Sequence, residues 1–299
     1  MQVEAHHKNS KGSAYWADLT ARETHAYRQI CLDQLLEEHF RRSCVSILEL
    51  GVGTDTVLLD YKHRFGAARA VGVDYDEPAI RRMRQAYPEA SWQVADIMEM
   101  RPEGRYDLVL LLDVVHEIYS FYGRPGRQLS ERVDHALGLQ AVGTMFDNLC
   151  GSIEPGGAIA LTDNVLPNVD RPMQIRMRHQ AARAAVERFV DTYPSKKISA
   201  SWDGDVLSLP ASDLCVLLTQ YNKIKQGKED RWEVERMEVH QYMSEAEYCA
   251  FFARLGFATY AILGTPSQAL SEWEEDFDLV AGGEAFPHKR ITLLAVRRA

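Results

Sequence analysis

The chain passes through Val45-Ser-Ile-Leu-Glu-Leu-Gly-Val-Gly-Thr-Asp55, an apolar run that ends in two closely spaced glycines. Further apolar residues follow at helical spacing as far as Phe65, so the pattern predicts a strand, a tight turn and a helix over residues 54–65. Gly51 and Gly53 allow the backbone to approach a ligand closely, and the start of a helix presents unpaired N–H groups. The stretch therefore predicts a cofactor-binding turn.

Two acids that end later apolar runs indicate a nucleoside cofactor. Asp74 ends the run 70–74 and lies 23 residues after Gly51, where an acid at the end of the neighbouring strand can accept both hydroxyls of a ribose. Asp96 closes the run 91–96, and we expect a third strand to end there beside an adenine ring.

The residues around the glycines argue against a dinucleotide. Glu49 directly precedes the turn, and a carboxylate there suits a positively charged ligand and repels a pyrophosphate. The dinucleotide signature G-x-G-x-x-G requires a third glycine, and Thr56 stands in its place. A nicotinamide enzyme is therefore disfavoured.

Composition narrows the class of protein further. The 299 residues suffice for one large α/β domain with a cap or for two small domains. A net charge of −9 argues against a nucleic-acid partner. The five cysteines are widely spaced with no C-x-x-C pair, which favours reduced thiols over disulfides or a zinc site. With a polar N-terminus and no apolar run long enough to span a membrane, the chain is interpreted as cytoplasmic, with no membrane partner.

The central region alternates between apolar runs and helical patterns. This alternation predicts a doubly wound parallel sheet with ligands bound where its strands end. The strands are predicted near 45–50, 70–74, 91–95, 107–112 and 157–163, and the helices near 54–65, 77–87 and 128–152.

Four features together resemble the class I S-adenosylmethionine-dependent methyltransferases. They are Glu-Leu-Gly-Val-Gly-Thr at 49–54, Asp74, the pair Ala95-Asp96, and the strand 106–113 that runs into Val114-Val-His-Glu-Ile118. The resemblance spans about 45–166 and resumes near 244. It implies an α/β fold with a mostly parallel, seven-stranded, Rossmann-like sheet and a terminal antiparallel hairpin, to which this chain adds a helical cap. It also implies S-adenosylmethionine as the cofactor.

The resemblance further implies which residues hold the cofactor. Those at the glycine turn would hold its amino-acid end, those after the second strand its ribose and base, and those after the third strand its adenine. Tyr15 and Asp113 would face the methionine end or the acceptor. The expected cofactor residues are Tyr15, Glu49, Gly51, Gly53, Asp74, Tyr75, Asp96, Ile97 and Asp113.

We expect the chain to divide into four parts. Residues 1–42 form an N-terminal helical lid, 43–166 the cofactor-binding core, 167–243 a helical cap insertion and 244–299 the completion of the core sheet. Within the cap and the last part, the pattern predicts helices at 173–193 and 211–225, a helix capped by Ser244, strands at 258–263 and 291–296, and an acidic loop at 265–286. That loop is either a dimer contact or solvated surface.

Methyl transfer from a sulfonium needs a positioned acceptor and, for a protonated acceptor, one base. His116 follows the fourth strand and is the best-placed candidate base, with Glu117 beside it to orient it or compete with it. The pair begins like the zinc motif H-E-x-x-H, but Ser120 stands in the fifth position, so no metal site is predicted. A buried histidine that only lines the wall is the simpler alternative.

Other residues are candidates for binding the acceptor or for catalysis. Tyr119 lies in the aromatic segment after His116, and His240 and Tyr242 lie in a polar, aromatic segment before the last helix of the core. Arg176 is one of several cap arginines that would suit an anionic acceptor, although a solvated helix face explains them equally well.

The sequence thus favours S-adenosylmethionine-dependent methyl transfer to a small molecule, anionic or amino-acid-like, at nitrogen, oxygen or carbon. One alternative is a protein of the same fold that binds the cofactor or a partner without turnover. A less favoured one is an NAD(P)-dependent oxidoreductase. In the methyltransferase, the N-terminus and the insertion would form a helical lid over the site.

Overall fold

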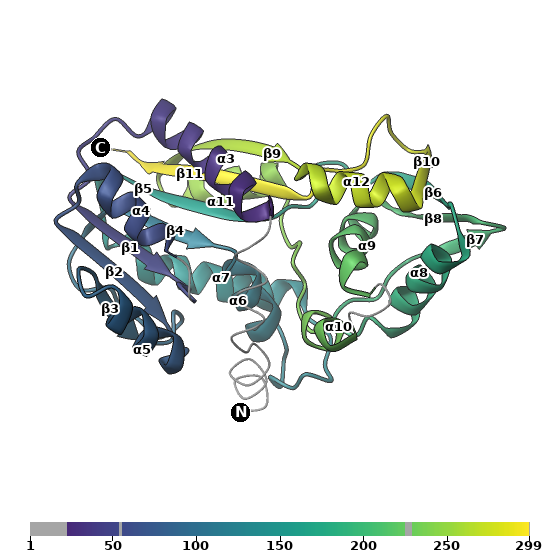
Figure 1. The fold of residues 1–299 in the computed structure, drawn as a ribbon, viewed down its shortest axis with the longest axis horizontal. Helices are drawn as coiled ribbons and strands as arrows, with labels where there is room; N and C mark the ends of the chain where they lie inside the picture. Colours follow the sequence, from purple (N-terminus) through teal and green to yellow (C-terminus); the bar gives the residue numbers. More distant parts are fainter. Residues whose placement is uncertain (1–22, 54–55, 225–228, 299) are drawn as a thin grey trace.

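The computed structural model describes residues 23–53, 56–224 and 229–298, and it contains two sheets (Figure 1). The larger has seven strands in the order β3-β2-β1-β4-β5-β11-β9. Its first five strands are parallel to one another, whereas β11 runs antiparallel to both β5 and β9. The strands are β1 (Ser46–Leu50), β2 (Arg69–Asp74), β3 (Ser91–Val94), β4 (Tyr106–Leu112), β5 (Ile153–Asn164), β9 (Phe257–Gly264) and β11 (Arg290–Arg297). The predicted Rossmann-like sheet with its antiparallel hairpin is confirmed.

Helices cover both faces of this sheet because its central strands are apolar on both sides. In β4, Leu108 and Leu110 point into one core and Val109 and Leu111 into the other. The first core also contains α3 (Glu23–His39), α4 (Val57–Phe65) and α5 (Glu77–Ala86). The second contains α6 (Val115–Tyr122), α7 (His135–Cys150) and α11 (Glu245–Arg254). The long helix predicted at 128–152 is therefore shorter, and α6 before it was not predicted.

The sequence had predicted a helical insertion, but the structure shows both strands and helices there. Its first segment is the strand β6 (Pro172–Met177) rather than the start of a helix, and α8 (Gln180–Thr192) follows. Met173, Ile175 and Met177 alternate with less buried residues, a period of two that fits a strand. The cap also holds β7 (Ser201–Asp203), β8 (Val206–Pro210), α9 (Ala211–Ile224) and α10 (Glu229–Glu235).

The acidic segment 265–286 was predicted to be a loop, and this was wrong. It forms α12 (Ser267–Asp276) and β10 (Phe277–Ala281), and β10 pairs with β6 at the edge of a four-stranded antiparallel sheet ordered β10-β6-β8-β7. Trp273 and Phe277 are buried against the helices of the cap. This sheet lies at the far end of the molecule from β3 and α5 (Figure 1). The expected four-part division stays a prediction, but a strand from beyond residue 244 completes the cap.

Arg124 joins the loop after α6 to the cap, and we expect its loss to destabilise the fold. Its buried guanidinium donates to the carbonyl oxygens of Ser120, Glu131 and Met237 and to the hydroxyl of Ser195. Arg124→Met leaves several buried acceptors without a donor, so the free energy of unfolding should fall by about 3 kcal/mol or more. Urea denaturation measures it.

The exposed Arg132 in the same loop provides the control for this substitution. Arg132→Met should change the free energy of unfolding by less than about 0.5 kcal/mol. Equal effects of the two variants would contradict the bridging role of Arg124.

Candidate active site

The glycine turn has the conformation that close approach to a ligand requires. Gly51 and Gly53 have φ values of 77° and 55°, in the left-handed region where a side chain is unfavourable. The backbone N–H groups of Gly51 and Val52 both donate to the carbonyl oxygen of Val73, at 2.8 and 3.2 Å. The turn is thus pinned to the end of the neighbouring strand β2.

Asp74 shapes this turn in a way that the sequence did not reveal. Its buried carboxylate accepts hydrogen bonds from the backbone N–H of Gly53 at 2.7 Å and of Asp76 at 2.9 Å. Burial raises the pKa of Asp74, which these two bonds partly offset, and the nearby Glu117 raises it further. The predicted contact of Asp74 with a ribose stays a prediction, but the residue lies beside the turn as expected.

The other expected cofactor residues lie at the same edge of the sheet. Asp96 accepts hydrogen bonds from the backbone N–H of Met98 at 2.8 Å and from the hydroxyl of Tyr122 at 2.7 Å. Ile97 beside it is buried, and Tyr75 after β2 is half-buried. The role of Tyr122 was missed, although its aromatic segment had been noted.

The remaining expected cofactor residues are Glu49 and Tyr15. Glu49 is buried within β1, and β1 lies between β2 and β4 in the sheet. Tyr15 lies outside the described residues.

Asp113, at the end of β4, holds two arginines. Its carboxylate pairs with Arg28 of α3 and with Arg290 of β11, and its own φ is 58°. Burial opposes its charge, but the two guanidinium groups outweigh burial and hold the pKa of Asp113 well below its usual value. The expected contact of Asp113 with the cofactor stays a prediction. The ion pair of Arg28 thus connects α3 to the end of β4.

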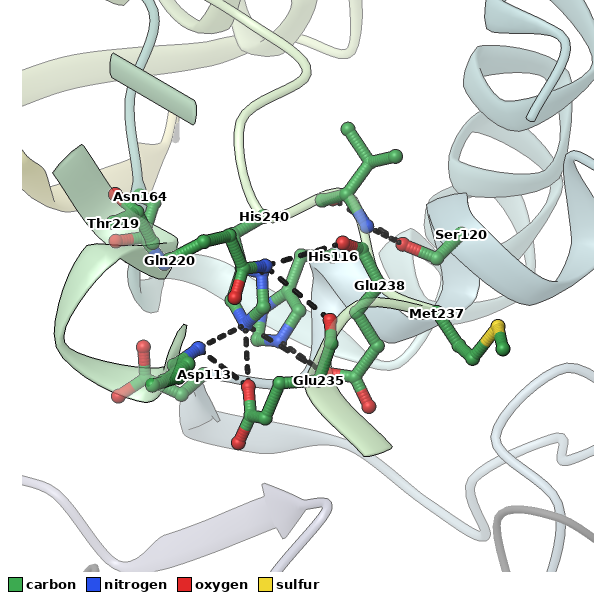
Figure 2. Close-up of polar contacts among 12 residues, drawn as sticks. Asp113, His116, Ser120, Asn164, Thr219, Gln220, Glu235, Met237, Glu238 and His240 are labelled. Atoms are coloured by element: carbon green, nitrogen blue, oxygen red, sulfur yellow. Dashed lines mark hydrogen bonds and ion pairs between the residues drawn. The ribbon is translucent and has the colours of Figure 1, made fainter. Parts of the chain in front are cut away.

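His116 belongs to a buried cluster that joins the core to the cap (Figure 2). Its Nδ1 lies 2.8 Å from Asp163 Oδ1 and its Nε2 lies 3.6 Å from Glu238 Oε2. The ring stacks on that of His240 with centroids 4.5 Å apart. Burial favours the neutral ring, but Asp163 and Glu238 together raise its pKa well above the usual value. The sequence had paired His116 with Glu117, whereas the structure pairs it with Asp163.

His240 faces a mixture of charges. Its Nε2 lies 3.2 Å from Glu235 Oε2 and 3.3 Å from Lys223 Nζ, and its Nδ1 lies 3.1 Å from the amide nitrogen of Gln220. Burial, aided by Lys223 and His116, lowers the pKa of His240 to about 4. The cluster therefore acts on the two stacked rings in opposite directions, raising the pKa of His116 and lowering that of His240.

The predicted acceptor residues fall into two groups. Tyr119 and Tyr242 stack with centroids 4.9 Å apart, and the hydroxyl of Tyr242 reaches Asp163 at 3.4 Å, next to His116. Arg176 lies instead in β6 of the cap sheet, where it pairs with Asp205 at 3.5 Å. The structure thus brings the tyrosines to the histidine cluster but not Arg176.

Comparison with known proteins supports the same class. Residues 47–122 match the model of a methyltransferase domain family. The chain is 29% identical over 181 residues to a trans-aconitate 2-methyltransferase of Azoarcus sp. (strain BH72). The matched region covers 59% of this chain and 60% of that protein. The chain therefore matches about three fifths of the length of that relative.

Solved structures share the fold at low identity. The plantazolicin methyltransferase BamL has a TM-score of 0.54 and 11% identity, over 100% of this chain and 95% of that one. The 1,6-didemethyltoxoflavin-N1-methyltransferase of Burkholderia thailandensis has a TM-score of 0.51 and 13% identity, over 99% and 89%. The chain thus shares the fold of these methyltransferases, and residues 47–122 match a methyltransferase domain, as the resemblance in the sequence had predicted.

Among residues 23–53, 56–224 and 229–298, no helix combines the length and the apolar composition needed to cross a bilayer.

Proposed function

We propose that this chain transfers a methyl group from S-adenosylmethionine to a small molecule that carries a carboxylate. The observation that carries the cofactor assignment is the glycine turn, held with positive φ at Gly51 and Gly53 and braced by Asp74. Asp96 and Tyr122 add polar groups at the same edge of the sheet. The methyltransferase domain match over residues 47–122 supports this proposal.

The residues fit the parts of this cofactor. The turn would hold its amino-acid end, Asp74 its ribose, and Asp96 with Ile97 its adenine. The bound cofactor supplies an electrophilic methyl group on a sulfonium. The residues of the chain need only hold the acceptor in line with that methyl group and exclude water, because a sulfide leaves without a proton.

A cationic region beside this edge favours an anionic acceptor. Arg28 and Arg290 converge on Asp113, and the half-buried Lys289 precedes Arg290. The carbonyl of Lys289 accepts from the backbone N–H of Val165, just after β5. The curated relative is named for trans-aconitate, a carboxylate. We therefore place the acceptor carboxylate near Lys289, instead of Arg176 in the cap sheet.

A carboxylate acceptor removes the need for a general base, because its oxygen is already deprotonated. Asp163 and Glu238 lie against the two nitrogens of the His116 ring and raise its pKa, so we propose that it does not act as a base. Catalytic roles for His116, Glu117 and His240 stay predictions, as do acceptor contacts of Tyr119, Arg176, His240 and Tyr242. Cytoplasmic location and a homodimer are likewise predictions.

Lys289→Met should weaken acceptor binding by about tenfold or more, seen as a higher KM with little change in kcat, because a charged partner of the carboxylate is lost. Burial, together with Lys223 and Arg290, lowers the pKa of Lys289 to about 7. The ammonium is charged below that pH and neutral above it, so KM of the parent enzyme should rise between pH 6 and pH 8. Steady-state kinetics across this range tests both.

Lys197→Met, at an exposed site in the cap, is the control and should leave KM unchanged. If KM for the acceptor were the same in Lys289→Met and the parent enzyme, the assignment of Lys289 would fail.

Calorimetric titration tests the proposed function as a whole. We expect S-adenosylhomocysteine to bind and NADH not to bind, and we expect S-adenosylhomocysteine to form from S-adenosylmethionine when a panel of small carboxylic acids is added. Binding without turnover on any acid or metabolite extract would favour the non-catalytic alternative. Binding of NADH alone would favour an oxidoreductase.

A further inference from the structure

A group of metal-ligating atoms lies between the core and the cap. Within the described part of the chain, His116, Glu238 and His240 each offer one ligand atom, and these three atoms lie within 4.8 Å of one another. All three side chains are buried. His116 comes from α6 of the core, whereas Glu238 and His240 come from the segment that leaves the cap after α10 (Figure 2).

The distances between these atoms suit a small divalent ion. Glu238 Oε2 lies 3.6 Å from Nε2 of His116 and 3.6 Å from Nε2 of His240. Ligands about 2.0–2.1 Å from a tetrahedral zinc ion lie about 3.4 Å apart. The ligand atoms of the two histidines lie within 4.8 Å of each other, so the stacked rings would have to tilt and close by up to about 1.4 Å for all three atoms to reach one ion.

Asp163 holds one proton of the His116 ring on Nδ1, and an ion at Nε2 would displace any proton there. Its Nδ1 faces Asp163 at 2.8 Å, and Asp163 also accepts from the backbone N–H of His116 at 3.0 Å. Carboxylates have this position behind the histidine ligands of many zinc sites, where they hold the proton on Nδ1. The Nε2 of His116 is then the atom that faces Glu238.

His240 is oriented in the same sense. Its Nε2 lies 3.2 Å from Glu235 Oε2, an acceptor, and 3.3 Å from Lys223 Nζ, a donor, so this nitrogen can face Glu235 through a proton or Lys223 through a lone pair. An ion at Nε2 selects the second form, with the proton on Nδ1 beside the side-chain amide of Gln220. A half-turn of that amide would let its Oε1 accept this proton, in exchange for the two bonds that its nitrogen now donates to the carbonyl oxygens of Glu235 and Glu238. Both histidines direct Nε2 toward Glu238.

We propose that His116, Glu238 and His240 bind a divalent transition-metal ion, of which zinc fits this ligand set best. Two imidazole nitrogens and a carboxylate form a common zinc set. Without the ion, the ammonium of Lys223 supplies the local positive charge and contacts both Glu235 and His240. The ion displaces Lys223 from His240 and leaves it paired with Glu235. The metal then joins α6 of the core to the cap.

The sequence did not predict this site because its ligands have no recognisable spacing. His116 lies in a motif that lacks the second histidine of H-E-x-x-H, and Glu238 and His240 lie far along the chain in an irregular segment. Only the packing of the cap on α6 brings them together. The inference concerns metal binding alone, so it does not depend on the proposed methyl transfer.

Zinc titration against a chromophoric chelator tests the inference on the full chain, without cofactor or acceptor. We expect one ion per chain with a dissociation constant of about a micromolar or below. Glu238→Gln preserves the shape of the side chain and should weaken binding by at least about tenfold. Lys223→Met removes the competing ammonium and should tighten it. Cobalt in place of zinc should give the visible absorption of a four-coordinate ion, which Glu238→Gln should lose.

His63→Ala, an exposed histidine of α4, is the matched control and should bind zinc as the parent does. The histidines His6 and His7 remain in every variant, so they cannot produce a difference. Circular dichroism establishes that each variant is folded. Absence of a stoichiometric site in the parent, or the same zinc isotherm for the parent and the folded Glu238→Gln variant, would overturn the proposal.

Discussion

Gly51→Ala is expected to weaken binding of S-adenosylhomocysteine by about a hundredfold or more and to lower the free energy of unfolding by about 3 kcal/mol. An added Cβ would lie 2.5 Å from Val114 Cγ2 and 2.9 Å from Val114 Cβ, so the turn or the start of α6 must move. The φ of 77° adds backbone strain to this clash. Because the predicted cofactor site is built on this turn, a displacement of even 1 Å should be costly to binding.

Gly66→Ala separates the two contributions. Gly66 ends α4 with a φ of 63°, close to that of Gly51, but an added Cβ would meet no atom within 4 Å. This variant should lose about 1 kcal/mol of stability from backbone strain alone and should bind the ligand normally. Urea denaturation and calorimetry measure both properties. Comparable losses of binding in the two variants would mean that the turn is not the cofactor site.

The sheet was predictable because each of its strands carries its own local signal. Apolar runs ending in an acid or a glycine mark β1, β2 and β4, and in a parallel sheet such ends meet at one edge. The same logic would have found Asp163, which lies near the end of β5. Asp163 was overlooked because no recognisable motif follows the strand predicted at 157–163, although its carboxylate orients His116.

The cap could not be predicted to the same degree, since its pairings are non-local. β6 has β8 and β10 as its neighbours. The segment that forms β10 was predicted to be a loop because it is rich in acidic residues. The cluster of His116 and His240 depends in turn on where the cap packs. Spacing along the chain carries no information about such contacts. The candidate residues were therefore identified singly, while their partners Lys223, Glu235 and Glu238 were missed.

Asp74→Asn should reduce the affinity for S-adenosylhomocysteine by about ten- to a hundredfold, because a neutral amide replaces the charged acceptor expected for the ribose hydroxyls. The effect on stability should be smaller. Burial already disfavours the charged form of Asp74, so removing the charge relieves part of that cost. One carbonyl oxygen cannot serve both Gly53 and Asp76, however, and one backbone N–H will face the amide nitrogen. A loss of about 1 kcal/mol should result.

The same substitution two residues later provides the comparison. Asp76 caps α5 by accepting a hydrogen bond from the backbone N–H of Ala79, and asparagine is about as good a cap as aspartate. Asp76→Asn should therefore leave both stability and ligand affinity nearly unchanged. Calorimetry on the two variants isolates the carboxylate of Asp74 from a general loss of negative charge near the turn. If Asp74→Asn bound the ligand as tightly as Asp76→Asn, Asp74 would brace the turn only, and the ribose would need another acceptor.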